Sequence, residues 1–196
     1  MPQINAPADF LTALDSLKGH TFRPELHVTQ IPPPQRIAPW AVALQAEVND
    51  SQKLDPDQYR GNARFVLLHD PQGQPAWGAT FRVVTYASAP VDTEIGDDPL
   101  LGEVAWAWLT EALTNHGVAY RNLTGTVTRI YNETFGGLEL ASSRTEVELR
   151  ASWSPVSPDA SEHLEAWADF TALICGLGPE EVASLPHLEE TNDRIR

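Results

Sequence analysis

Thr145-Glu146-Val147-Glu148-Leu149-Arg150-Ala151-Ser152-Trp153 is the most regularly alternating stretch of this sequence. From Glu146 on, its polar and charged side chains occupy every second position, with mainly apolar side chains between them. Successive side chains of a β-strand point to opposite faces of a sheet, so this alternation predicts a strand with one buried and one solvated face. A sheet built from such strands needs a covering layer on only one side.

Further strands are predicted on the N-terminal side of this stretch. They cover residues 40–48, a hairpin over 65–86 with its turn at 70–75, and residues 118–131, which are rich in Thr, Val and Tyr. Several prolines between residues 24 and 39 predict an extended path before the first strand, because proline cannot pair within a central strand.

Three segments show the 3.6-residue apolar period of amphipathic helices. They start near Pro7, Asp97 and Ser157 and end at Gly19, Gly117 and Gly176. Tight turns between the strands favour antiparallel pairing, with the helices packed on one face. The prediction is therefore an α+β fold with the order α-βββ-α-ββ-α and a mainly antiparallel, twisted sheet. It forms one domain over residues 1–186, followed by a polar, flexible tail at 187–196.

The acidic charge of the chain is concentrated in its second half. The 196 residues carry a formal net charge of −14, of which −13 lies in residues 91–196. This charge repels phosphate groups and anionic lipids, so we expect neither nucleic acid nor a membrane as a direct ligand. Solvated acidic helices and an acidic surface for a basic partner are both consistent with the charge pattern.

The single cysteine and the N-terminus indicate the compartment. Cys175 cannot form an internal disulfide and suits a reducing environment. The first residues lack the basic and apolar regions of a signal peptide, and no run of about 18 apolar residues is present. We therefore expect a cytoplasmic protein.

Sequence motifs for common chemistries are absent. The chain has no glycine-rich phosphate-binding motif and no GxSxG nucleophile motif. The six histidines are scattered, which does not predict a metal centre. We therefore expect no cofactor and no metal, and we favour a protein without catalytic activity.

One side of the predicted sheet mixes charged, aromatic and apolar side chains, as binding surfaces do. It consists of Thr80, Arg82, Val84, Tyr86, Glu148 and Arg150. This side is the predicted working or dimerising face. Trp106 is a further candidate for contact with a partner, because it lies two residues from Trp108 and so points about 200° away around the helix. Core packing is the alternative for Trp106.

Arg129 and His69 suggest a different kind of site. Arg129 falls on the same side of its strand as Leu123 and Val127, so it either extends past the strand end or marks a pocket with an acid such as Glu47. His69, at a strand–turn junction, is the best placed general base, unless the turn backbone satisfies it. An enzyme or small-ligand binder would combine Arg129, His69 and Glu47.

Several motifs also resemble a known family. They are Ile37-Ala38-Pro39-Trp40, Val66-Leu67-Leu68-His69-Asp70-Pro71, Phe81-Arg82-Val83-Val84-Thr85-Tyr86, Asp98-Pro99-Leu100-Leu101, Gly125-Thr126-Val127-Thr128-Arg129 and Arg150-Ala151-Ser152-Trp153. Over about residues 8–186 the chain resembles the actinobacterial family catalogued as domain of unknown function 3000. No catalytic residues are established for that family. The resemblance implies a cytoplasmic actinobacterial protein and a neighbouring gene for a ribonuclease D-like exonuclease.

The order of elements separately resembles that of type III secretion chaperones, by analogy of topology alone. Those proteins bind other proteins through sheet and helix surfaces. The leading hypothesis is therefore a non-enzymatic, acidic protein-binding or regulatory module whose partner is another protein or a second copy in a homodimer. One alternative is the pocket near Arg129, His69 and Glu47. The other is an accessory to a ribonuclease in RNA processing.

Overall fold

The computed structural model describes residues 6–49, 59–133 and 145–178. Its elements are α1 (Ala8–Ser16), β1 (Leu26–Ile31), β2 (Trp40–Asn49), β3 (Tyr59–Gln74), β4 (Ala79–Val91), α2 (Thr93–Gly96), α3 (Leu101–Asn115), β5 (Tyr120–Tyr131), β6 (Thr145–Pro155) and α4 (Ser161–Ile174). The predicted α+β class is confirmed. The edge strand β1 forms within the segment predicted to be extended, and the short helix α2 precedes α3. The predicted tail at 187–196 lies outside the described residues.

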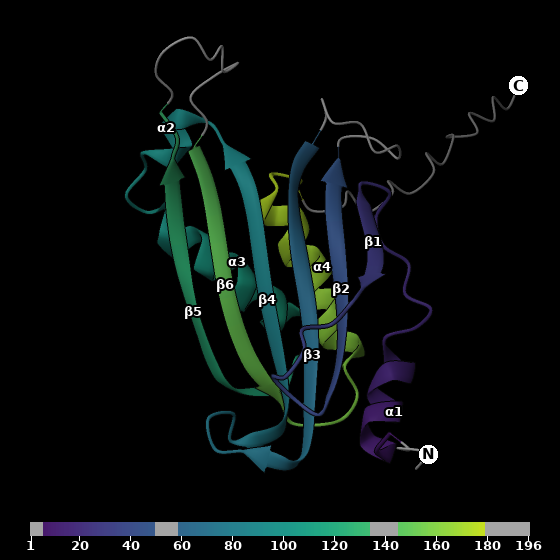
Figure 1. The fold of residues 1–196 in the computed structure, drawn as a ribbon. Helices are drawn as coiled ribbons and strands as arrows, with labels where there is room; N and C mark the ends of the chain where they lie inside the picture. Colours follow the sequence, from purple (N-terminus) through teal and green to yellow (C-terminus); the bar gives the residue numbers. More distant parts are fainter. Residues whose placement is uncertain (1–5, 50–58, 134–144, 179–196) are drawn as a thin grey trace, which may run out of the picture.

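The six strands form one sheet in the order β1-β2-β3-β4-β6-β5, in which every neighbouring pair is antiparallel. The predicted strand 145–153 becomes β6, which lies between β4 and β5 (Figure 1). β6 is an interior strand, so its side chains pack against those of two neighbouring strands on both faces of the sheet.

Helices α3 and α4 pack behind the sheet as it is viewed in Figure 1, and α1 lies near the end of β2 and β3. The alternating side chains Val147, Leu149 and Trp153 of β6 are fully buried in this layer. Trp167 of α4 is also fully buried, and its ring lies 5.7 Å from that of Phe65 on β3. The apolar stripe of α4 thus meets the apolar side of the sheet and forms the main core.

The β3–β4 hairpin turns later than the sequence predicts. The strand ladder is interrupted between His69 and Gln74, and the turn itself follows Gln74, whose carbonyl accepts hydrogen bonds from the amides of Trp77 and Gly78. The Asp-Pro-Gln-Gly stretch at 70–73 therefore forms the irregularity in the ladder. Proline and glycine are equally suited to a bulge and to a turn, which explains the shifted boundary.

Two polar groups are enclosed by the core beside α4. The indole N–H of Trp153 donates a hydrogen bond of 2.8 Å to Nδ1 of His163. Burial lowers the pKa of His163 from 6.5 to about 4. Burial also raises the pKa of the Cys175 thiol to about 12. Both groups are therefore neutral at physiological pH.

Among the residues described, no helix combines the length and apolarity required to cross a membrane.

We expect acid to destabilise the fold through His163. The unfolded chain takes up this proton below about pH 6.5, whereas the folded chain does so only near pH 4. Stability is therefore fully present above pH 6.5 and is lost as the pH falls toward 4, by about 3 kcal/mol. Burial lowers the pKa of His69 as well, so that residue acts in the same direction. Urea unfolding at pH 7.5 and pH 4 measures the loss.

His163→Asn is the matched variant, because its amide oxygen lies close to the position of Nδ1 of His163 and accepts the Trp153 hydrogen bond without titrating. Its stability should fall about 3 kcal/mol less between the two pH values than that of the unmodified chain. An equal fall in both proteins would show that His163 is not the group that titrates.

Candidate interaction face of the sheet

The side of the sheet opposite α3 and α4 is turned toward the viewer in Figure 1, and we call it the open face. The strand register places its side chains in rows that cross the sheet. The arginine row contains Gln45, Arg64, Tyr86, Arg150 and Thr126 on β2, β3, β4, β6 and β5. The neighbouring glutamate row is offset by two residues on every strand. It contains Glu47, Asn62, Ser88, Glu148 and Thr128. Four of the predicted site residues, Arg82, Tyr86, Glu148 and Arg150, share this face.

A hydrogen-bonded cluster occupies the centre of the two rows. The hydroxyl of Tyr86 donates to Oε1 of Glu148 at 2.9 Å, and Nη2 of Arg150 lies 2.6 Å from Oε2 of the same carboxylate. The Arg150 guanidinium also lies 5.4 Å from the centre of the Tyr86 ring. Burial and the adjacent carboxylate raise the pKa of Tyr86. The Arg150 side chain is 58% exposed and that of Glu148 only 13%, so the arginine is the accessible member.

The net charge of the open face differs from that of the helix layer. The paired strand segments of this face carry Arg64, Arg82, Arg121 and Arg150 together with Glu47, Glu146 and Glu148, a formal sum of +1. Helices α3 and α4 carry Glu103, Glu111, Glu162, Glu165 and Asp169 and no lysine or arginine. Repulsion therefore opposes an acidic partner at the helix layer but not at the open face.

Part of the open face is covered. Ala43 and Leu68 have outward register positions yet are only 1% and 2% exposed. The connection between β1 and β2, residues 32–39, passes across β2 and β3 on this side in Figure 1. The uncovered part therefore centres on Val84, which is 37% exposed, and on the two rows.

Arg82 does not belong to the accessible part of this face, contrary to the prediction. Only 7% of it is exposed. Its guanidinium donates to the carbonyl oxygen of Asn122 at 2.9 Å and to the hydroxyl oxygens of Ser154 and Ser152 at 3.0 and 2.6 Å. Asn122 has a φ of 53° at the irregularity where β5 departs from β6. Arg82 thus fastens this irregular segment to β4, and burial lowers its pKa.

Trp106 is not a free contact residue either. It is half-buried and packs against the core, and a Cβ on Gly125 of β5 would collide with its ring. Helix α3 lies close to β5, so β5 covers the side of the helix that carries Trp106, next to the side that faces the core. A separation of about 200° from Trp108 around the helix does not imply exposure when the helix has a neighbour on two sides.

Arg129 stabilises a turn instead of marking a pocket. Its guanidinium donates to the carbonyl oxygens of Asp98 at 2.8 Å and of Gly96 and Pro99 at 3.3 Å each. These carbonyls lie between α2 and α3, so Arg129 connects β5 to the start of α3. The carbonyl oxygens of the turn replace the carboxylate partner that the sequence suggested.

The predicted pocket of Arg129, His69 and Glu47 is therefore wrong. β2 and β5 are four strand spacings apart, about 19 Å, and Glu47 and Arg129 have register positions on opposite faces. His69 is 1% exposed and stacks between the rings of Phe10 and Phe81, whose centres are 5.9 and 4.2 Å away. It serves as part of the core beneath α1.

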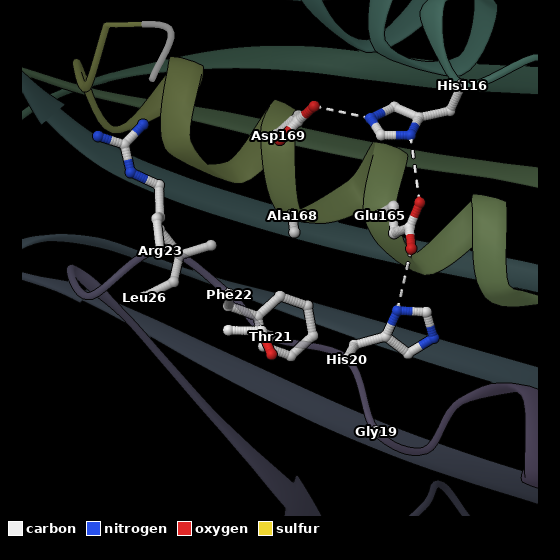
Figure 2. A pocket seen from close by; sticks show the side chains of 10 residues that line it. All are labelled: Gly19, His20, Thr21, Phe22, Arg23, Leu26, His116, Glu165, Ala168 and Asp169. Atoms are coloured by element: carbon white, nitrogen blue, oxygen red, sulfur yellow. Dashed lines mark hydrogen bonds and ion pairs between the residues drawn. The ribbon is translucent and has the colours of Figure 1, made fainter. Parts of the chain in front are cut away.

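The structure reveals a second cluster that the sequence reasoning missed, beside α4 (Figure 2). Nδ1 of His20 lies 3.2 Å from Oε1 of Glu165, whose other oxygen lies 3.5 Å from Nδ1 of His116. Nε2 of His116 lies 2.7 Å from Asp169. These residues line a cavity of about 340 Å³ between α4 and the segment that leads from α1 to β1.

This histidine–carboxylate cluster joins three parts of the chain. His20 also contacts the carbonyl oxygen of Ser16 at 2.8 Å, so it connects the end of α1 to α4, and His116 connects the end of α3 to α4. Glu165 and Asp169 lie at opposite edges of the His116 ring and do not converge on one point. Among the residues described, no group of three or more His, Cys, Asp or Glu side chains could hold a metal ion.

A signal for this cluster was present in the sequence. His20 follows Gly19 and His116 precedes Gly117, so both histidines lie at helix C-termini, where positive charge is favoured. Glu165 and Asp169 are four residues apart on one helix face. Only the fold shows that these helix ends meet.

Comparison with known proteins identifies the family. A family model described as "Protein of unknown function (DUF3000)" matches residues 6–183. The chain belongs to this family. No curated protein matches the chain, and no solved structure does. The DUF3000 motifs quoted above include Phe81–Tyr86 of β4 and Arg150–Trp153 of β6, so they supply three of the four predicted residues on the open face.

Arg82 and Arg150 lie on the same face of adjacent strands and should differ sharply in their contribution to stability. Arg82→Gln removes charged hydrogen bonds from buried acceptors and should lower the free energy of unfolding by about 3 kcal/mol. Arg150→Gln removes an exposed ion pair and should lower it by about 1 kcal/mol or less. Urea unfolding measures both, and equal losses would contradict the structural role of Arg82.

Substitution of Gly125 should lower the stability of the fold, whereas substitution of Gly102 should not. A Cβ at Gly125 would meet the Trp106 ring and, at 2.8 Å, the carbonyl oxygen of Arg150, whereas Gly102 of α3 has open space around it. Gly125→Ala should destabilise the chain by about 1–3 kcal/mol. Gly102→Ala should stabilise it by up to about 1 kcal/mol through helix propensity. Thermal unfolding checks both, and a neutral Gly125→Ala would show that Trp106 does not pack on β5.

Proposed function

We propose that this DUF3000 chain is a protein-binding module and that the open face is its docking surface. The observation that carries the proposal is the Tyr86–Glu148–Arg150 cluster, which lies on the same face of the sheet as the exposed Val84. Arginine and tyrosine are among the residue types that protein interfaces favour at their centre.

The arrangement of the cluster favours binding. The Tyr86 hydroxyl and the Arg150 guanidinium both contact the Glu148 carboxylate, so their conformations are already restricted. Side chains that are restricted before association lose less conformational entropy when a partner docks. The Arg150 side chain remains 58% exposed although it is paired with Glu148, so it is accessible to acceptors of a partner.

The size of the uncovered face indicates a weak or transient complex. Six strands span about 24 Å and the rows from Val84 to Glu146 cover about 20 Å along the strands, so the uncovered area is at most about 500 Å², less the part around Ala43 that is covered. Stable complexes bury about 800 Å² on each partner. Micromolar affinity is therefore the expected range.

Site-specific photo-crosslinking tests the proposal. A photoreactive amino acid replaces Val84 on the open face in one variant and Glu103 on α3 in a matched control, and both are expressed in cells that naturally contain the protein. We expect a defined protein adduct from position 84 and none from position 103. Adding Arg150→Glu to the first variant should remove the adduct, because it eliminates the central cation.

Mass spectrometry of the adduct identifies the partner. Absence of an adduct at position 84, or an adduct that forms equally at position 103, would contradict a docking function of the open face. Circular dichroism of each purified variant confirms that the fold is retained.

A further inference from the structure

We infer that the open face binds a second copy of the same chain, with the arginine row of each copy opposite the glutamate row of the other. This inference rests on the proposed function and names the partner. The inference rests on the positions of positive and negative side chains along the strands, which the strand register determines.

The two rows are adjacent and opposite in charge. Arg64 and Arg150 lie in the arginine row, on either side of Tyr86. Glu47 and Glu148 lie in the glutamate row, on either side of Asn62 and Ser88. Two residues of a strand separate the rows by about 6.6 Å. The face therefore presents a positive band beside a negative band.

A single symmetry operation matches these bands. Two copies are stacked with their open faces toward each other. A two-fold axis lies between the two sheets, perpendicular to the strands and midway between the rows. This axis places the arginine row of each copy opposite the glutamate row of the other. Arg150 then faces Glu148 of the second copy, and the reverse contact forms at the same time, as an isologous interface requires. Because both sheets twist, the rows can match closely only over a few strands, and the opposite charges place this match at β4 and β6, where Tyr86, Glu148 and Arg150 lie.

The charge of the other surfaces favours this choice of partner. A chain with a net charge of −14 repels its own copies at long range. The described parts of α3 and α4 carry only acidic charges, so two helix layers would repel each other at contact as well. The open face, with a formal sum of +1, adds far less repulsion at contact than the acidic helix layer and allows opposite charges to pair.

Charge exchange between two variants tests the inference. Sedimentation equilibrium at 5–200 µM in about 50 mM salt, where surface charges are weakly screened, measures the mass. The unmodified chain should approach twice its 21.6 kDa as its concentration rises. Arg150→Glu makes both rows negative at the centre and Glu148→Arg makes both positive, so each variant alone should remain monomeric. An equimolar mixture of the two should dimerise.

The double variant Arg150→Glu/Glu148→Arg restores opposite rows within one chain and should dimerise again. Glu103→Arg, on the helix layer, is the control and should dimerise like the unmodified chain. Circular dichroism establishes that each variant is folded, and a variant that unfolds is replaced by Arg150→Gln and Glu148→Gln, each of which should weaken the dimer at least fivefold.

Two results would overturn the inference. One is an unmodified chain that stays monomeric at 200 µM, and the other is a mixture of the two reversed variants that fails to associate. If a different protein crosslinks at position 84 while the chain is monomeric, the docking function holds and the second copy is excluded as the partner. If position 84 gives no adduct, both proposals fail.

Discussion

Burial of apolar side chains on one side of the sheet is the constraint on which the remaining structure depends. Trp153 and Leu149 of β6 and Trp167 of α4 are fully buried between the sheet and its helices. Because side chains alternate along a strand, the two sequence neighbours of every residue buried in this layer point to the opposite face of the sheet. The position of Glu148, Arg150 and their counterparts on β2, β3 and β4 therefore follows from core packing. The open face is the necessary counterpart of the core, and its charges pair because they project from adjacent positions.

Two mechanisms bury side chains of the open face without the help of helices. The connection between β1 and β2 covers Ala43 and Leu68, and the irregular start of β5 encloses Arg82. The arginine needs no carboxylate because hydroxyl and carbonyl oxygens of two strands accept its hydrogen bonds. A buried cation with only neutral partners is costly to desolvate, so its surroundings must be rigid to keep all acceptors in place. The Tyr86–Glu148–Arg150 cluster therefore lies beside a rigid part of the sheet.

The sequence pattern predicted the elements that depend on local periodicity and missed those that depend on long-range contact. Alternation placed Arg82, Tyr86, Glu148 and Arg150 on one face, which the register confirms. It did not reveal that Arg82 is buried, because that depends on the positive φ of Asn122, forty residues later in the chain. The same limit applies to Arg129, whose partners are backbone carbonyls without a sequence signature. The histidine–carboxylate cluster combines residues 20, 116, 165 and 169, which only the packing of helix ends brings together.

The location of Cys175 has a practical consequence. Its thiol is buried against Gly61 of β3, and burial holds its pKa at about 12, so thiolate is nearly absent at neutral pH. Alkylating probes and oxidants act on thiolate, and this sulfur offers them neither charge nor access. Since it is also the sole cysteine, a new one placed on the surface becomes the only reactive handle on the molecule. Fluorophores or spin labels can thus be attached at chosen positions while the native sulfur stays in place.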